Sequence, residues 1–188
     1  KTSFLKDTKL LYLFARINKM YKVSVVLSVY NQEKFLEESL GSILKQSFSG
    51  FEFLIVDDAS SDRSLSIIKQ FAGKDKRIKI IVNQKRLGLT KSLNIGLRKA
   101  QGEYIARMDG DDIALPDRLE KQIKFLDSRP QTALIGSWAI LIDKKGRKLK
   151  IKKTPVSFRE ISRLILKGNP FIHPTIMFRK KILEDIGL

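Results

Sequence analysis

The chain has 188 residues, of which 43% are hydrophobic, and a net charge of +17 from 37 Lys and Arg against 20 Asp and Glu. This composition describes one globular domain with a core and argues against disorder. The absence of cysteine excludes disulfides and thiolate chemistry, and a single histidine, His173, excludes a multi-histidine zinc site. No apolar run of about 18 residues occurs, so no bilayer-spanning segment is predicted.

Residues 1–21 are predicted to form an amphipathic basic helix, because apolar side chains such as Phe4, Leu11 and Phe14 recur among lysines and arginines. Such a helix can lie on an anionic membrane surface or pack its apolar face on the domain, and both interpretations stay open. The chain starts at Lys1 and ends at Leu188 within what reads as an element, so we expect it to be part of a longer protein.

From residue 22 onwards, predicted strands and helices alternate. The strands are expected at 23–29, 51–56, 78–82 and 104–108, and the intervening helices at 33–46, from about 60 to 71, and at 88–100. A helix from 116 to about 128, a strand over 132–142 and a capped helix over 157–167 follow. This alternation predicts an α/β fold with a largely parallel sheet. Neither a GxGxxG nor a Walker A sequence occurs, which argues against a dinucleotide-binding oxidoreductase or a P-loop enzyme.

The densest basic segment, residues 144–153, is predicted to belong to a β-hairpin. Its central Lys145-Gly146 reads as a turn between the apolar residues 139–142 and an alternating second strand. A solvated, charged edge is favoured over a nucleic-acid site, because no aromatic-interleaved basic motif accompanies the charge. Nucleic acid is therefore not expected as a partner, whereas anionic lipid or phosphorylated substrates suit the positive charge.

Polar side chains follow the ends of the four predicted parallel strands. They are Ser28, Tyr30 and Asn31 after the first, Asp57 and Asp58 after the second, Asn83 and Arg86 after the third, and Asp109 and Asp111 after the fourth. Because the carboxyl ends of parallel strands meet at one edge of a sheet, we expect these side chains to form a single polar rim. We place the functional site at this rim.

Three carboxylates in four residues, Asp109, Asp111 and Asp112, directly follow the fourth strand. Asp109 and Asp111 can both point oxygens at one Mg²⁺ or Mn²⁺ and leave coordination positions for the phosphates of a nucleotide. Alternatively, Asp109-Gly110 is a tight turn and the aspartates cap the next element. An EF-hand is excluded, because Ile113 and Ala114 stand where it requires a ligand and a glycine.

Four ordered segments together resemble the inverting family 2 glycosyltransferases of GT-A fold, with their DxD-type motif. The segments are 23–31, 56–62, 86–94, and Asp109-Gly110-Asp111-Asp112 followed by Leu115-Pro116-Asp117-Arg118-Leu119. The resemblance covers roughly residues 22–180 and is specific because the motifs occur in order and with the family's spacing. It implies that residues 22–188 form a GT-A domain, a three-layer α/β/α sandwich around a mostly parallel mixed sheet.

The resemblance implies a metal-dependent transfer of a sugar from a nucleoside-diphosphate donor, most commonly UDP, to a saccharide or lipid-linked acceptor in cell-surface polysaccharide synthesis. Ser28 and Tyr30 would surround the base and Asp58 would hydrogen-bond it. The full donor-binding set that it implies is Ser28, Tyr30, Asn31, Asp57, Asp58, Arg86, Asn94 and Asp109. The implied metal ligands are Asp109, Asp111 and His173, holding Mg²⁺ or Mn²⁺ against the departing diphosphate.

The general base that inverting transfer needs is not assigned. In similar enzymes a carboxylate downstream of the histidine-proline segment at His173 serves this role, and His173 itself has a structural role as the alternative. Asp185 is one candidate base, but we expect the base beyond Leu188 and leave the catalytic residue unknown. A catalytically incomplete nucleotide-sugar-binding or interaction module is therefore the alternative function. The expected location is cytoplasmic, with peripheral contact at the inner membrane face as a further expectation.

Overall fold

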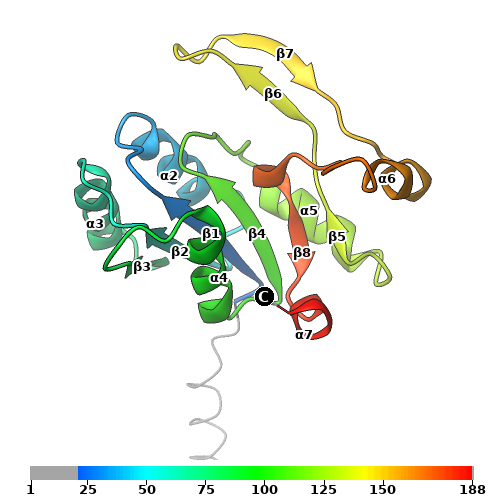
Figure 1. Ribbon diagram of the computed structural model, residues 1–188, viewed down its shortest axis with the longest axis horizontal. Coiled ribbons are helices and arrows are strands. Elements are labelled where there is room, and N and C mark those ends of the chain that lie inside the picture. Colours follow the sequence, from blue (N-terminus) through cyan, green and yellow to red (C-terminus); the bar gives the residue numbers. More distant parts are fainter. Residues whose placement is uncertain (1–20, 188) are drawn as a thin grey trace, which may run out of the picture.

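The computed structural model describes residues 21–187, and the helix predicted for residues 1–21 lies outside them except for Tyr21 (Figure 1). The strands are β1 (Val23–Val29), β2 (Phe51–Asp57), β3 (Ile78–Val82), β4 (Tyr104–Asp109), β5 (Leu134–Ile135), β6 (Ala139–Ile142), β7 (Lys148–Lys152) and β8 (Met177–Arg179). The helices are α2 (Leu36–Leu44), α3 (Ser64–Lys74), α4 (Leu89–Lys99), α5 (Arg118–Asp127), α6 (Phe158–Leu164), the 3-10 helix η1 (His173–Thr175) and α7 (Ile182–Ile186). The predicted alternation of strands and helices up to β4 is confirmed.

The central sheet has six strands in the order β3-β2-β1-β4-β8-β5. The four strands from β3 to β4 run parallel, whereas β8 is antiparallel to both β4 and β5. Every residue of β1 and β2 is buried, as expected for parallel strands covered on both faces. The predicted mostly parallel mixed sheet is therefore confirmed.

Helices cover both faces of this sheet and give the predicted three layers (Figure 1). On one face, Val25 and Leu27 of β1 share a core with side chains of α2, α3 and α5. On the other face, Val26 of the same strand lies in a core with residues of α4 and α7. A Cβ on Gly96 of α4 would lie 2.7 Å from Val26 Cγ1, so glycine permits the close approach of α4 to the sheet.

The single strand predicted over residues 132–142 is wrong. The structure divides this segment between β5 at the edge of the central sheet and β6, which pairs with β7 in a separate two-stranded sheet. Between them, the Ser137 N–H donates to Thr175 Oγ1 and Trp138 Nε1 donates to the Thr154 carbonyl. These bonds direct the chain away from the central sheet, which hydrophobic patterning alone does not reveal.

The hairpin of β6 and β7 lies on the side of the molecule towards which the carboxyl ends of β1 and β4 point (Figure 1). Asp143 closes its turn by accepting hydrogen bonds from the backbone N–H groups of Lys145 and Arg147. The predicted basic hairpin is confirmed, and every residue of β7 is exposed. Within residues 21–187, no helix combines the length and the apolar character needed to cross a bilayer.

Candidate functional site

A polar pocket of about 330 Å³ opens at the carboxyl edge of the parallel strands. Its walls are Ser28, Tyr30, Gln32, Asp58, Arg86, Gly88, Leu89, Asp109 and Asp111. These residues come from the last part of β1 and the segment after it, from the segments after β2 and β3, from the start of α4, and from the end of β4 and the segment after it. The topology thus brings together six of the residues that the sequence predicts for the site, Ser28, Tyr30, Asp58, Arg86, Asp109 and Asp111.

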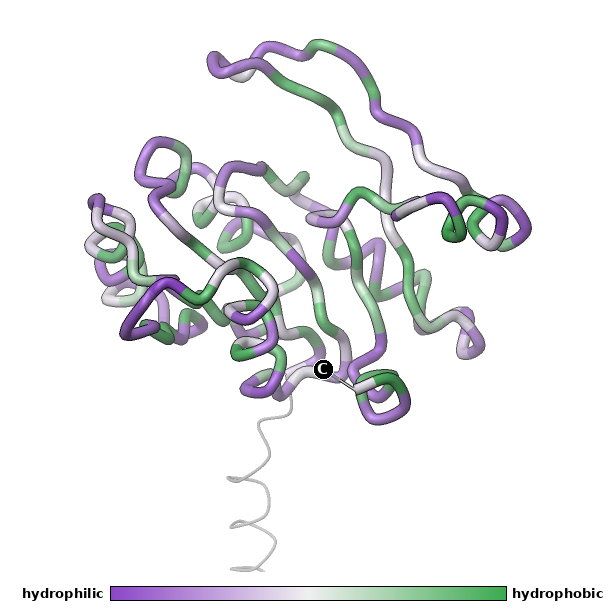
Figure 2. Tube along the Cα trace, in the orientation of Figure 1, coloured by the Kyte–Doolittle hydropathy of each residue, from purple (hydrophilic) through white to green (hydrophobic). Residues whose placement is uncertain are grey.

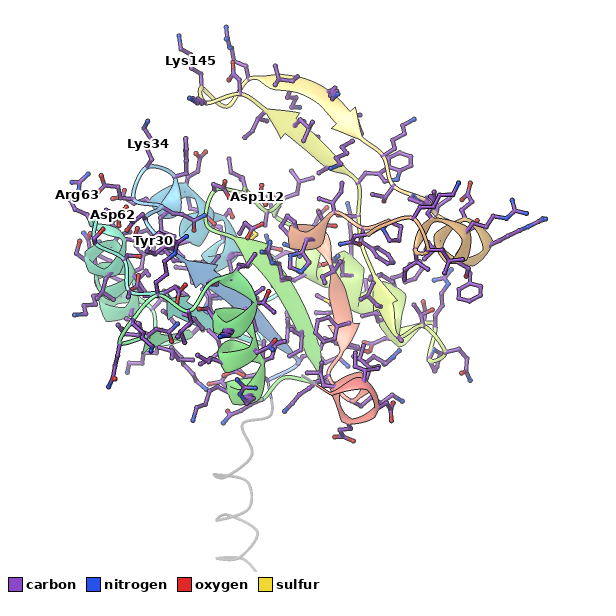
Figure 3. All side chains as sticks on the ribbon, in the orientation of Figure 1. Tyr30, Lys34, Asp62, Arg63, Asp112 and Lys145 are labelled. Carbon is purple, nitrogen blue, oxygen red and sulfur yellow. The ribbon has the colours of Figure 1, made fainter. Side chains whose placement is uncertain are left out.

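Tyr30 and Arg86 form a stacked pair in the wall of the pocket. The Arg86 guanidinium carbon lies 4.1 Å from the centroid of the Tyr30 ring. Planar stacking of this kind stabilises a guanidinium and leaves flat surfaces available to a further ring. In Figure 3, Tyr30 and Asp112 are both labelled towards the carboxyl end of the sheet. The pair therefore provides a surface against which a nucleobase can pack.

Asp58 is buried and fixes the loop that carries Arg86. Its Oδ1 accepts hydrogen bonds of 2.8 Å from the Leu87 N–H and from Asn83 Nδ2, and its Oδ2 accepts one of 2.8 Å from the Gly88 N–H. Burial would raise the pKa of Asp58, but these hydrogen bonds together lower that pKa below its usual value. An ionised carboxylate therefore ties the end of β2 to the segment preceding α4.

Three residues predicted to bind the donor, Asn31, Asp57 and Asn94, do not line the pocket. The side-chain oxygen of Asn31 accepts a 2.8 Å hydrogen bond from the Ser61 N–H, which joins the segments after β1 and β2. Asp57 is fully buried and its Oδ2 accepts from the Ser60 N–H, while its Oδ1 has no hydrogen-bond partner. Asn94 lies within α4. Their predicted roles in binding remain predictions.

Gln32, Gly88 and Leu89 line the pocket but were missed by the sequence analysis. Gln32 Oε1 is buried without a hydrogen-bond partner. A Cβ on Gly110 would collide with this oxygen, so the amide packs directly on the backbone of the acidic segment. The sequence feature that could have identified Gln32 as a site residue is its position in the polar segment after β1. Gly88 has a φ of 88°, which favours glycine, and stands inside the segment already identified from 86 to 94.

The acidic segment after β4 forms a compact cluster. Carboxylate oxygens of Asp109, Asp111 and Asp112 lie within 4.8 Å of one another. Burial, followed by the charges of Asp109 and Asp111, raises the pKa of Asp112 to about 6. The Asp112 N–H also donates to the Asp109 carbonyl at 3.4 Å, so a turn and a carboxylate cluster coexist here. Such a donor set of crowded carboxylates fits a hard divalent cation.

Arg107 is a buried cation beside this cluster. Its Nη1 forms an ion pair with Asp109, while its Nε has no hydrogen-bond partner. Arg118, from the Leu115 to Leu119 motif, donates from Nη2 to the Arg107 carbonyl at 2.7 Å and to the Ile176 carbonyl at 3.4 Å. The motif arginine therefore fastens the end of β4 to α5 and to the segment before β8, which holds the acidic segment in place.

His173 and Asp185 differ in their relation to the pocket. Burial lowers the pKa of His173. The positive charge of Arg107 lowers this pKa further, whereas the negative charge of Asp109 raises it, so His173 lies within electrostatic reach of the pocket. His173 is not part of the carboxylate cluster, whose third member, beside Asp109 and Asp111, is Asp112. Asp185 lies on α7, and the segment just before α7 is held to the residue preceding β4 by the hydrogen bond from the Lys180 N–H to the Glu103 carbonyl. In Figure 1, α7 lies at the end of the sheet opposite to the carboxyl ends of β1 and β4, so the helix that carries Asp185 is remote from the pocket.

The three-layer fold, with a polar pocket and an acidic cluster at the carboxyl edge of its parallel strands, is that of glycosyltransferase domains of the GT-A class. The model of the family "Glycosyl transferase family 2" matches residues 24–187. The chain therefore belongs to glycosyltransferase family 2.

Relatives with known sequences or structures agree with this assignment. The chain is 42% identical over 167 residues to an uncharacterised glycosyltransferase of Methanocaldococcus jannaschii, covering 87% of the chain and 58% of that protein. It is 37% identical over 166 residues to the amylovoran biosynthesis glycosyltransferase AmsE of Erwinia amylovora, covering 87% and 62%. The crystal structure of Staphylococcus aureus TarS 1-349 with UDP-GlcNAc superposes with a TM-score of 0.71 at 28% identity, covering 88% of this chain and 47% of TarS. The chain thus spans roughly three fifths of the length of the two sequence relatives.

Proposed function

We propose that this domain binds the donor for a metal-dependent, inverting glycosyltransferase that moves a sugar from a UDP-sugar to a saccharide or lipid-linked acceptor in cell-surface polysaccharide synthesis. The observation that carries the proposal is the single pocket joining the Tyr30 and Arg86 stack to the acidic cluster. The UDP-GlcNAc bound by TarS supports the choice of UDP, and the name of AmsE supports a polysaccharide pathway.

The two ends of the pocket suit the two ends of a nucleoside diphosphate. The aromatic and guanidinium surfaces of Tyr30 and Arg86 would stack against the base, and the remaining acceptor capacity of Asp58 would meet its N–H groups. Asp109, which lines the same pocket, would contact the ribose or the cation. Ser28 lies on the same wall and can donate from its hydroxyl. These contacts would hold the diphosphate towards the acidic cluster.

Asp109 and Asp111, with Asp112 beside them, would hold Mg²⁺ or Mn²⁺. Burial, and then the neighbouring charges of Asp109 and Asp111, raise the pKa of Asp112, and a cation held by this cluster would relieve the crowded negative charge. When bound, the cation would neutralise charge on the departing diphosphate. His173 is a candidate for contact with the diphosphate or the cation, because its pKa responds to both Arg107 and Asp109.

The acceptor proton must be taken by a base, which we propose is supplied from outside residues 21–187. The carboxylate of Asp58 is held by three hydrogen bonds. The carboxylates of Asp109, Asp111 and Asp112 face the proposed cation, and Asp185 lies at the other end of the sheet. None of these five groups is therefore suited to deprotonate an acceptor hydroxyl.

The experiment that tests donor binding is calorimetric titration of UDP with and without Mn²⁺ or Mg²⁺. We expect binding that requires the metal and that weakens by at least about 100-fold in Asp111→Ala, because the cation joins protein and diphosphate. Asp117→Ala is the matched control, since Asp117 pairs with Lys121 and does not line the pocket. Equal UDP affinity with and without metal, or in Asp111→Ala, would contradict the proposal.

A binding or interaction module that is catalytically incomplete is the second candidate function, favoured by the position of Asp185 away from the pocket. Release of UDP from a UDP-sugar by a longer chain that includes residues after Leu188 distinguishes the two. Metal-dependent UDP binding without sugar transfer or hydrolysis, even by that longer chain, is expected for the module. Transfer to an added acceptor by residues 1–188 alone would show that these residues suffice for catalysis.

A further inference from the structure

The hairpin and the helix that follows it form a strongly basic extension of the fold. We call residues 139–167, which include β6, β7 and α6, the basic arm. It contains ten Lys and Arg against two acidic residues, a net charge of +8 out of the +17 of the whole chain. The arm projects from the central sheet on the side to which the carboxyl ends of β1 and β4 point (Figure 1).

The same arm exposes large apolar side chains. Ile140 and Ile151 lie opposite each other in the hairpin and are 40% and 58% exposed, and Leu149 is 66% exposed. No residue of α6 is buried, and Phe158 at its start is 85% exposed. Figure 2 shows hydrophobic and hydrophilic residues interspersed along the arm. A two-stranded hairpin has little stability by itself, and apolar side chains gathered at a surface are typical of an interaction site.

The positive charges of the arm are not neutralised within it. Asp143 is engaged by Arg147 and by the hairpin turn, and Glu160 forms a capping box with Ser157. In the part of the chain that the structure describes, Lys148, Lys150 and Lys152 form no ion pair with a carboxylate. Their charges therefore remain available to an anionic partner.

Trp138 stands at the base of the hairpin in a setting that suits a lipid headgroup region. It is 46% exposed, its Nε1 donates to the Thr154 carbonyl at 3.0 Å, and Lys153 Nζ lies 5.0 Å from the centroid of its ring. Tryptophan and lysine are enriched together where an apolar phase meets headgroups and water, because each presents an apolar body and a polar tip.

We propose that the basic arm docks on an anionic lipid bilayer, with Leu149, Ile151 and Phe158 entering the interface. Lys148, Lys150 and Lys152 alternate with Leu149 and Ile151 along β7 and so lie on the other face of the hairpin, from which their charges attract the anionic headgroups over a short distance. Charge complementarity favours this occupant. A second copy of the chain would place one net charge of +8 against another, and a nucleic acid would engage the lysines but leave the apolar side chains in water. The proposal does not depend on donor binding. It would position the pocket beside the membrane surface.

The test is flotation of the full chain with vesicles of phosphatidylglycerol and phosphatidylcholine, compared with vesicles of phosphatidylcholine alone. Lys148→Gln, Lys150→Gln and Lys152→Gln together are expected to weaken binding to the anionic vesicles roughly 100-fold. The matched control replaces Lys74, Lys76 and Lys99, which are exposed on the body of the domain, and removes the same charge. We expect the control to bind within about 3-fold of the parent chain, because these lysines lie outside the arm.

A second pair of variants tests the apolar contact. Leu149→Ser with Ile151→Ser is expected to weaken vesicle binding roughly 10-fold, because two apolar side chains no longer enter the interface. Val82→Ser with Phe125→Ser is the control at exposed apolar positions away from the arm. Circular dichroism checks that each variant is folded. Since β7 and these side chains are exposed, we expect the arm variants to fold.

Equal vesicle binding by the parent chain and both arm variants would overturn the proposal, as would absence of binding to the anionic vesicles. Loss in the lysine variant with no loss in the Leu149 and Ile151 variant would also overturn it, in favour of a purely ionic contact. Tighter binding to a labelled DNA or RNA duplex than to the vesicles would favour nucleic acid. Dimerisation in light scattering that the apolar variant abolishes, without vesicle binding, would favour a second copy.

Discussion

The two ends of the central sheet differ in whether their buried polar groups are hydrogen-bonded. At the amino end, Glu52 is fully buried, and its Oε1 accepts hydrogen bonds of 2.6 Å from Ser24 Oγ and from the Gln101 N–H, while its Oε2 pairs with Lys79 at 2.6 Å. At the carboxyl end lie all the buried side-chain atoms without hydrogen-bond partners in residues 21–187. They are Gln32 Oε1, Asp57 Oδ1 and Arg107 Nε, together with Arg107 Nη1, whose one partner is its ion pair with Asp109.

Because of this difference, we expect the amino end of the sheet to contribute mainly to stability and the carboxyl end mainly to ligand binding. Buried polar groups in proteins are normally hydrogen-bonded, because leaving one without a partner costs free energy. The amino end follows that rule and should contribute to the free energy of unfolding. The carboxyl end departs from it beside a pocket, which is expected where a ligand provides the missing partners. Substitutions at the two ends should therefore have effects of different kinds.

The largest effect on stability is expected for Glu52→Ala at the amino end. Loss of the carboxylate removes the shortest hydrogen bonds of Ser24, the Gln101 N–H and Lys79 and leaves the last two with only longer ones, so we expect the free energy of unfolding to fall by about 3 kcal/mol. Urea denaturation measures it, and the UDP affinity of the folded variant should stay within about 2-fold of the parent. Glu103→Gln, in an exposed ion pair with Lys22, is the control and should cost less than about 1 kcal/mol. A loss as small as that of the control would contradict the comparison.

A smaller, pH-dependent loss of stability is expected for Asp58→Asn, because Asp58 both supports the fold and lines the pocket. An amide cannot accept all the hydrogen bonds of the carboxylate, so we expect a loss of about 2 kcal/mol at pH 7. Because the folded-state pKa of Asp58 lies below 3.8, the stabilisation is present above that value and is lost as the pH falls through the folded-state pKa.

Denaturation of the parent chain and Asp58→Asn between pH 7 and pH 2 measures this dependence. The difference in unfolding free energy between them should shrink as the pH falls below about 4. A difference that is independent of pH would mean that the ionised carboxylate is not what holds the Leu87 and Gly88 segment.

The contrast also shows which parts could be predicted from sequence. The polar rim could be predicted from the sequence, because its polar residues lie at or soon after the ends of strands with clear apolar patterning. Parallel topology gathers such residues at one edge of the sheet. The network of Glu52 could not, because its partners Ser24 and Gln101 are 28 and 49 residues away along the chain. No local pattern in the sequence encodes contacts over such separations.

Two further details depended on tertiary structure. The segment 132–142 carries one continuous β pattern, yet bonds from Ser137 and Trp138 divide it between two sheets. The carboxylate cluster includes Asp112 rather than His173, since a turn of the chain after β4 decides which oxygens meet. The sequence identified both regions but not these arrangements.

A modest effect is expected for Arg107→Met at the carboxyl end. The Arg107 guanidinium is buried and its Nε has no hydrogen-bond partner, whereas Asp109, which pairs with Nη1, is 28% exposed and stays in contact with water. An apolar side chain of similar volume should therefore change the unfolding free energy by no more than about 1 kcal/mol. Because Asp109 loses its paired cation, Mn²⁺ should bind several-fold more tightly in the absence of nucleotide. Calorimetric Mn²⁺ titration measures this, with Arg98→Met on α4 as the control for net charge. Weaker Mn²⁺ binding in Arg107→Met would show that the ion pair positions the carboxylate.

The smallest effect on stability is expected for Gln32→Leu. Since Gln32 Oε1 has no hydrogen-bond partner, an apolar side chain of similar size should leave the unfolding free energy within about 0.5 kcal/mol of the parent value. The same change removes a polar group from the pocket wall, so UDP affinity in the presence of Mn²⁺ should fall several-fold. Gln70→Leu, exposed on α3, is the control for both measurements. A large loss of stability with unchanged UDP affinity would mean that Gln32 supports the fold and is not one of the ligand-binding groups at the carboxyl end.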